Sequence, residues 1–107
     1  MAAKRLAQYE ARAGIIKALG HPARLLIVDE LSTAGERCVC ELAEMIGSDM
    51  STVSRHLAVL KGAGLVEREK RGQMVFYRLR MKCISSFFEC IESVMAGNAK
   101  IQQELLV

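Results

Sequence analysis

Two short helical segments joined by a very tight turn limit the possible folds more than any other part of the chain. Within residues 39–63, the segments 39–46 and 50–61 both have apolar side chains at helical spacing, and only Gly47-Ser48-Asp49 separates them. The second segment has one apolar stripe, made of Val53, Leu57 and Leu60. Two helices in this arrangement, the second packed through a single stripe, are typical of a helix-turn-helix.

The side of the second helix opposite that stripe carries polar side chains, one basic side chain and several small residues. We predict that it reads DNA through Ser51, Thr52, Ser54 and Arg55. An arginine near a helix N-terminus can bond a guanine edge, hydroxyls can bond phosphates, and the small Ala58 and Gly62 leave room for a major groove. The alternative is an ordinary amphipathic helix that Ser51 merely caps. His56 borders the buried arc, so we expect it to pack in the core rather than to contact DNA.

The segment that follows favours the DNA-reading interpretation. Residues 65–70 and 74–79 are β-prone and flank a glycine-containing turn, which predicts a hairpin over about residues 64–80. Its tip and flanks are basic, with Arg68, Lys70, Arg71 and Arg78. A basic hairpin directly after a helix-turn-helix is a wing. We predict that Arg68, Lys70 and Arg71 contact DNA phosphates beside the groove.

Four motifs, in this order, resemble the ArsR/SmtB family of small metal-sensing repressors, and most closely its arsenic-responsive branch. They are residues 20–27 (GHPARLLI), 38–42 (CVCEL), 51–57 (STVSRHL) and 72–79 (GQMVFYRL). The resemblance implies a homodimeric winged helix-turn-helix that binds a palindromic double-stranded operator and leaves it when an inducer binds. The expected fold class is mostly α with a β-hairpin wing.

Length and composition agree with one small intracellular domain over residues 1–107. The chain is 51% hydrophobic, has one proline and carries a formal net charge of +3, which is only weak evidence for nucleic acid. It has no apolar run long enough to span a bilayer and no signal-peptide core, so we expect a cytoplasmic protein without membrane contact. No nucleophile and base stand at a recognisable spacing, which argues against an enzyme.

The terminal segments predict the means of dimerisation. Helices are expected at about residues 3–19, 22–32 and 81–96, with a loop at 33–37, and the tail after residue 96 is compatible with a frayed continuation. The first and last helices both have apolar faces, and small proteins commonly bury such faces against a second copy. They could also pack on their own domain. The family resemblance favours the homodimer.

Cysteines carry the predicted inducer chemistry. Cys38 and Cys40 stand two residues apart before a helix, so an extended lead-in and one helical turn can direct both sulfurs to one ion. Soft thiolates suit arsenic(III), cadmium, lead and zinc. Free cysteines also behave as small buried hydrophobes. The CVCEL motif makes metal binding the preferred interpretation.

Two thiols leave a three-coordinate ion incomplete. In the arsenic-sensing branch the motif continues to a third cysteine, where this chain has Ala43; the cadmium and lead branch adds cysteines before the motif, and this chain has none there. We predict Cys83 as the third ligand. The alternatives are Cys90 and a non-protein thiol. Cys83 and Cys90 are about 10 Å apart along one predicted helix, so at most one should join, from either subunit. The Asp, His and Glu zinc cluster of the family's last helix is absent.

The sequence therefore predicts a transcriptional repressor that releases its operator when arsenite binds the thiols. Cadmium or lead could replace arsenite as the inducer. A repressor of the same fold could instead sense oxidants or persulfides through a disulfide. In the least favoured alternative the domain never binds specific DNA and serves protein interaction or metal storage.

Overall fold

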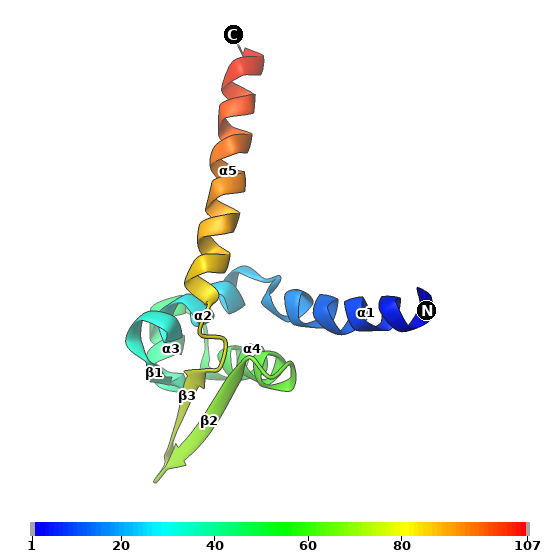
Figure 1. The fold of residues 1–107 in the computed structure, drawn as a ribbon. Helices are drawn as coiled ribbons and strands as arrows, with labels where there is room; N and C mark the ends of the chain where they lie inside the picture. The colour runs from blue at the N-terminus through cyan, green and yellow to red at the C-terminus, as the bar shows by residue number, and fades with distance from the viewer. Residues whose placement is uncertain (1, 107) are drawn as a thin grey trace.

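The computed structural model describes residues 2–106, which form five helices and one three-stranded antiparallel sheet (Figure 1). Strand β3 lies between β1 and β2. The elements in chain order are α1 (Ala2–Leu19), α2 (Pro22–Ala34), β1 (Glu36–Cys38), α3 (Val39–Ile46), α4 (Met50–Gly62), β2 (Val66–Arg71), β3 (Met74–Leu79) and α5 (Ile84–Leu106).

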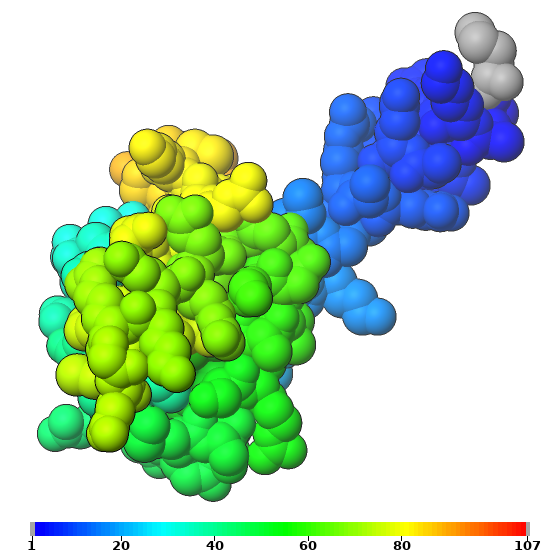
Figure 2. Space-filling model, turned by 90° about the horizontal axis from the view of Figure 1, so that it is seen from below, coloured from blue at the N-terminus to red at the C-terminus, as the bar shows by residue number. Residues whose placement is uncertain are grey.

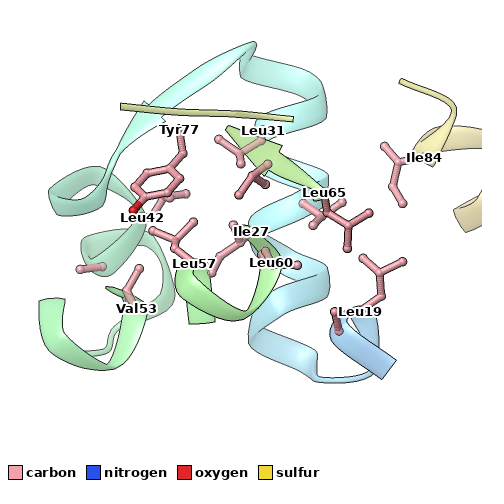
Figure 3. Close-up of a cluster of buried hydrophobic side chains, with 14 residues drawn as sticks. Leu19, Ile27, Leu31, Leu42, Val53, Leu57, Leu60, Leu65, Tyr77 and Ile84 are labelled. Atoms are coloured by element: carbon pink, nitrogen blue, oxygen red, sulfur yellow. The ribbon is translucent and has the colours of Figure 1, made fainter. Parts of the chain in front are cut away.

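Helix α2 is the centre of the domain, because it contacts every other helix as well as β1 and β3. Its Ile27, Val28 and Leu31 are fully buried, and Figure 3 shows Ile27 and Leu31 among side chains of α3, α4, β3 and α5. Burial of one large aliphatic side chain stabilises a fold by about 1.5–3 kcal/mol. The helix is not buried all round, since Leu26 remains 44% exposed.

The helix-turn-helix forms where the sequence predicts it. Helix α3 ends at Gly47, which adopts the left-handed conformation (φ 77°) and donates its N–H to the Ala43 carbonyl. Helix α4 begins at Met50 and is capped by Asp49, whose side chain accepts a hydrogen bond from the Thr52 N–H. Ser51 is therefore not the N-cap. The capping role that the alternative interpretation gave to Ser51 belongs to Asp49.

The prediction of a loop over residues 33–37 is wrong at its end, where β1 spans Glu36–Cys38. This strand pairs with β3, so that Cys38 lies opposite Phe76 and Glu36 opposite Arg78. Three residues are too few to show an alternating pattern in the sequence. The strand forms because the free edge of β3 offers backbone partners to the chain that leaves α2.

The prediction of a last helix over residues 81–96 is also wrong in its bounds, because α5 spans Ile84–Leu106. The helix begins later because the Arg80 N–H donates to the Leu65 carbonyl (2.8 Å) and residues 80–83 turn the chain out of the sheet. It continues past Gly97 because Ala, Lys, Gln, Glu and Leu, all strong helix formers, follow. One glycine costs only about 1 kcal/mol in a helix interior.

Helices α1 and α5 project from the domain at a wide angle to each other (Figure 1). Their apolar side chains stay exposed, among them Leu6 (62%), Ile16 (58%), Val94 (63%) and Leu105 (79%). The radius of gyration of the Cα atoms is 16.8 Å, whereas a compact chain of this length has about 13 Å. None of the helices within residues 2–106 combines the length and apolar character needed to cross a bilayer.

Candidate nucleic-acid interface and thiol pair

The exposed face of α4 carries the residues that the sequence predicts to read DNA. Ser51, Ser54 and Arg55 are exposed and Thr52 is half-buried, while the stripe of Val53, Leu57 and Leu60 is fully buried. The Asp49 carboxylate accepts hydrogen bonds from the Thr52 N–H (2.7 Å) and the Ser51 hydroxyl (3.0 Å). The hydrogen bonds from Thr52, more than that from Ser51, lower the pKa of Asp49. This cap fixes the first turn of α4, from which the polar side chains extend.

The two faces of the wing differ in what they carry. Side chains alternate along β2, and cross-strand partners share a face, so Arg68 lies beside Tyr77 and Lys70 beside Val75. Arg68, Val75 and Tyr77 line a cleft of about 560 Å³ together with Ser54, Ala58 and Lys61 of α4. Figure 2 shows this side of the molecule, where α4 (green) and the wing (yellow-green) lie next to each other. Arg68 and Lys70 therefore belong to the same face as the polar side of α4.

Arg71 lies on the opposite face of the wing and is held by carboxylates. It donates two hydrogen bonds to Glu36 of β1 (2.7 and 2.8 Å) and one to Glu69 (2.8 Å), and its guanidinium lies 4.6 Å from the centre of the Phe76 ring. Arg78 donates to Glu69 (2.9 Å). The hydrogen bond from Arg71 lowers the pKa of Glu36. A phosphate contact by Arg71 would have to compete with these ion pairs.

Sequence reasoning did not find this ion-pair network. The signal that could have revealed it is the order Glu67-Arg68-Glu69-Lys70-Arg71 in a strand. Strand alternation places both glutamates and Arg71 on one face and the other two basic residues on the second face. Glu36 could not be assigned to the network without knowing that β1 exists.

His56 packs at the junction of α1, α2 and α4, away from the exposed face of α4. Its ring centre is 4.4 Å from that of His21, which caps α2 by accepting the Ala23 N–H at Nδ1 (3.1 Å). Arg24 approaches His56 Nδ1 (3.5 Å) and donates from Nε to the Ala18 carbonyl (2.5 Å). Burial, followed by the positive charges nearby, lowers the pKa of His56. These contacts agree with the packing role predicted for His56.

Cys38 and Cys40 lie at the N-terminus of α3, in unlike surroundings. Cys38 is the N-cap and only 1% exposed; its Sγ accepts the Glu41 N–H (3.4 Å), and Glu41 Oε1 accepts the Cys38 N–H (3.1 Å). This is a capping box with a thiol in the place of the usual hydroxyl. Burial, and then the neighbouring Cys40 thiol, raises the pKa of Cys38 to about 11. Cys40, in the first helical turn, is exposed.

The carboxylate of Glu41 also ties the thiol pair to its surroundings. Arg37 of β1 donates to Glu41 Oε2 (2.9 Å) and to Glu30 Oε1 of α2 (3.0 Å). The hydrogen bonds with Cys38, followed by the one from Arg37, lower the pKa of Glu41. Both oxygens of Glu41 are thus occupied, and the capping box is connected to α2 through β1.

The two remaining cysteines are not brought to this pair. Cys83 lies in the turn before α5 and Cys90 within α5, so they do not share one helix as predicted, and both are exposed. Across residues 2–106 no three His, Cys, Asp or Glu side chains are grouped so that they could hold a metal ion. Two soft thiols fit a soft metal or metalloid in donor chemistry, but a single chain supplies only these two.

Comparison with known proteins agrees with this arrangement. Residues 21–68 match the family model described as "Bacterial regulatory protein, arsR family". The chain is 42% identical to the biofilm growth-associated repressor of Xylella fastidiosa over 88 residues, which cover 82% of this chain and 76% of that protein. The chain belongs to the ArsR family. Members of this family are DNA-binding transcriptional regulators and not enzymes.

Two other relatives are named for resistance to different elements, one to arsenic and one to cadmium. The chain is 43% identical over 65 residues to the arsenical resistance operon repressor of Escherichia coli, covering 61% of this chain and 56% of that protein. It is 42% identical over 67 residues to the Staphylococcus aureus cadmium resistance regulatory protein CadC homolog, with coverage of 63% and 55%. A solved homodimeric winged helix-turn-helix domain from Mycobacterium bovis, Mb0332, superposes with a TM-score of 0.75 at 31% identity, covering 91% of this chain and 89% of that one.

Proposed function

We propose that this ArsR-family protein is a homodimeric repressor that acts in the cytoplasm and releases its operator when arsenite binds Cys38 and Cys40. Ser51, Thr52, Ser54 and Arg55 enter the major groove, and Arg68 and Lys70 of the wing contact the phosphates. Arg71, which the sequence predicted with them, is held by Glu36 and Glu69. The observation that carries the proposal is the capping box of α3, which is built from the Cys38 thiol itself. An inducer on that sulfur cannot leave the first turn of α3 unchanged.

The homodimer is supported by the projecting terminal helices. The exposed apolar side chains of α1 and α5 have no partner within residues 2–106, and a small domain gains stability by covering such surface. A dimer would also place two reading helices on one operator, so that each half-site receives one copy of α4. The relative Mb0332 is homodimeric.

The release mechanism follows from the contacts of Cys38. Bond formation at Cys38 Sγ replaces the thiol proton with a much larger atom at a sulfur that is only 1% exposed, so the capping box that joins Cys38 and Glu41 must shift to admit it. Helix α3 packs directly on α4. A shift of α3 therefore tilts the reading face in both subunits. The inducer favours release because it binds the tilted dimer more tightly than the DNA-bound dimer, and the coupling acts equally in both directions.

Inorganic arsenite has three exchangeable positions, so one remains after the thiol pair has bound. We propose Cys83 as the third ligand, with Cys90 or a non-protein thiol as alternatives. Cadmium or lead are alternative inducers, supported by the cadmium-resistance relative. The two neighbouring thiols of Cys38 and Cys40 also leave room for a disulfide-based redox or persulfide sensor.

The test is DNA release by the reduced protein, measured by fluorescence anisotropy on its own upstream DNA. Arsenite, cadmium, lead, zinc and a mild oxidant are titrated separately. We expect arsenite to release DNA from the wild type and from Cys90→Ser, but not from Cys38→Ser, Cys40→Ser or Cys83→Ser. The reverse result for Cys83→Ser and Cys90→Ser would make Cys90 the third ligand. If only the oxidant releases DNA, the redox alternative replaces the metalloid. DNA binding without sequence preference, with a steep dependence on salt, would contradict the repressor assignment.

A further inference from the structure

A cavity of about 720 Å³ lies between α1 and α4, at the end of α1 that joins the domain (Figure 1). Cavities of roughly 300–1,000 Å³ are the usual size of small-molecule sites. We propose that this cavity binds an organic anion, namely a carboxylate carried on an apolar body. The inference goes beyond the proposed function, because neither the thiol pair nor an arsenical takes part in it.

The lining of the cavity explains why the ligand needs an apolar body. Three helices contribute to it, with Gly14, Ile15 and Lys17 from α1, Arg24 from α2, and Val59 and Gly62 from α4. A Cβ atom added at Gly14 or Gly62 would meet open space, so the missing side chains keep the cavity wide. Ile15 and Val59 are 40% and 43% exposed, and a ligand between them would cover apolar surface on both helices.

The charge of the cavity explains why the ligand is an anion. Arg24 is half-buried and donates to the carbonyls of Ala18 (2.5 Å) and Lys17 (3.4 Å), which carry only partial charges, while its Nη1 lies 3.5 Å from His56 Nδ1. Within residues 2–106 neither Arg24 nor Lys17 forms an ion pair, and no lining residue is acidic. A half-buried cation without a counter-charge is costly, and the planar guanidinium matches a carboxylate. A carboxylate between Arg24 and Lys17 therefore supplies the missing negative charge.

The cavity stays accessible in the proposed homodimer. Successive residues of a helix are turned by roughly 100°, so Ala11 and Ala18, which line the cavity, lie on the opposite side of α1 from Tyr9 and Ile16. Tyr9 and Ile16 are exposed and belong to the apolar face assigned to dimerisation, together with Leu6. A second copy that covers this face leaves the cavity side of α1 open. The bound anion then contacts the dimerisation helix and the reading helix at once.

The experiment is isothermal titration of the full chain with three probes at neutral pH: 2-naphthoate, its uncharged analogue 2-naphthamide, and acetate. We expect one 2-naphthoate to bind per chain. Naphthamide should bind about tenfold more weakly because it cannot neutralise Arg24 and Lys17, and acetate about a hundredfold more weakly because it lacks the apolar body. Equal affinity for naphthoate and naphthamide would overturn the role of charge, and equal affinity for naphthoate and acetate would overturn the role of the apolar lining. No binding of naphthoate would overturn the site.

Two pairs of variants locate the binding site. Gly14→Leu fills the cavity and should abolish naphthoate binding, whereas Gly97→Leu, a glycine of α5 that also faces open space, should bind as the wild type does. Leucine favours a helix more than glycine does, so neither change should unfold the chain.

Lys17→Gln should weaken naphthoate binding by about threefold, and the control Lys4→Gln, on the same helix but outside the cavity lining, should not. Unchanged binding by Gly14→Leu would place the ligand elsewhere and overturn the inference. Cys38→Ser should bind naphthoate normally; loss of binding in this variant would contradict a site separate from the thiols. Failure of arsenite to release DNA would refute the proposed function and leave the anion site intact.

Discussion

Two neighbouring basic residues of the wing should contribute very differently to DNA binding. Lys70 and Arg71 are consecutive and both exposed, yet strand alternation places them on opposite faces. Lys70 shares the face of Arg68, which borders α4, whereas Arg71 is bound to Glu36 and Glu69. We expect Lys70→Ala to remove a phosphate contact. Arg71→Ala is the matched control of equal charge change.

The magnitude follows from counterion release. Each phosphate that a cationic side chain neutralises contributes about 0.9 to the slope of log affinity against log salt, so Lys70→Ala in both wings of a dimer should reduce that slope by about 1.8. A fourfold rise in salt should therefore weaken wild-type binding about tenfold more than Lys70→Ala binding. Arg71→Ala should change the slope by well under half as much, because its carboxylate partners already neutralise that charge.

The assay is fluorescence anisotropy of the two variants and the wild type over a salt series, with thermal unfolding to confirm that all three are folded. Arg68→Ala should behave like Lys70→Ala. An Arg71→Ala slope as shallow as that of Lys70→Ala would show that Arg71 leaves its ion pairs to bind phosphate. The assignment of the two wing faces to different tasks would then be wrong.

Three further predictions concern stability and assembly. Gly47→Ala should destabilise the fold by about 1–2 kcal/mol in urea unfolding, because alanine is strained at a φ of 77° even though its methyl group meets no other atom. Gly62→Ala is the control and should not destabilise the fold, because Gly62 has no positive φ. The pKa of His56 is lowered in the folded chain, so His56 does not change the free energy of unfolding at pH values above its ordinary pKa of about 6.5. As the pH falls below that value, His56 takes up a proton in the unfolded chain but not in the folded chain. The free energy of unfolding therefore declines until the pH passes the folded pKa. His56→Gln should flatten that decline, and an unchanged profile would contradict the cause assigned. Leu6→Glu should yield monomers in sedimentation velocity while Gln8→Glu stays dimeric; dimers of both would exclude this face of α1 from the interface.

The helix-turn-helix and the wing could be predicted from the sequence because local rules decide them. Val53, Leu57 and Leu60 recur at helical spacing, and all three are fully buried. Gly47 supplies the positive φ that a tight turn between helices needs. In such segments the pattern along the chain and the final packing agree, so the chain alone specifies the element.

The features that escaped prediction depend on partners far away in the chain. Strand β1 exists because β3, nearly 40 residues later, offers an edge. The start of α5 depends on the bond from Arg80 to Leu65, and the role of Arg71 depends on Glu36. No periodicity within a short window can report such pairings.

Strand β1 is also where the two halves of the functional surface meet. Its three consecutive side chains serve three contacts: Glu36 binds Arg71 of the wing, Arg37 joins α2 to α3 through two carboxylates, and Cys38 caps α3. The strand is only three residues long, and its backbone pairs with β3 at Cys38 itself. A ligand that pulls on Cys38 Sγ therefore acts on the α3 cap and on the strand that holds Arg71. Helix α3, which packs on α4, and the wing are both connected to this sulfur through β1, so the proposed inducer would act on both at once.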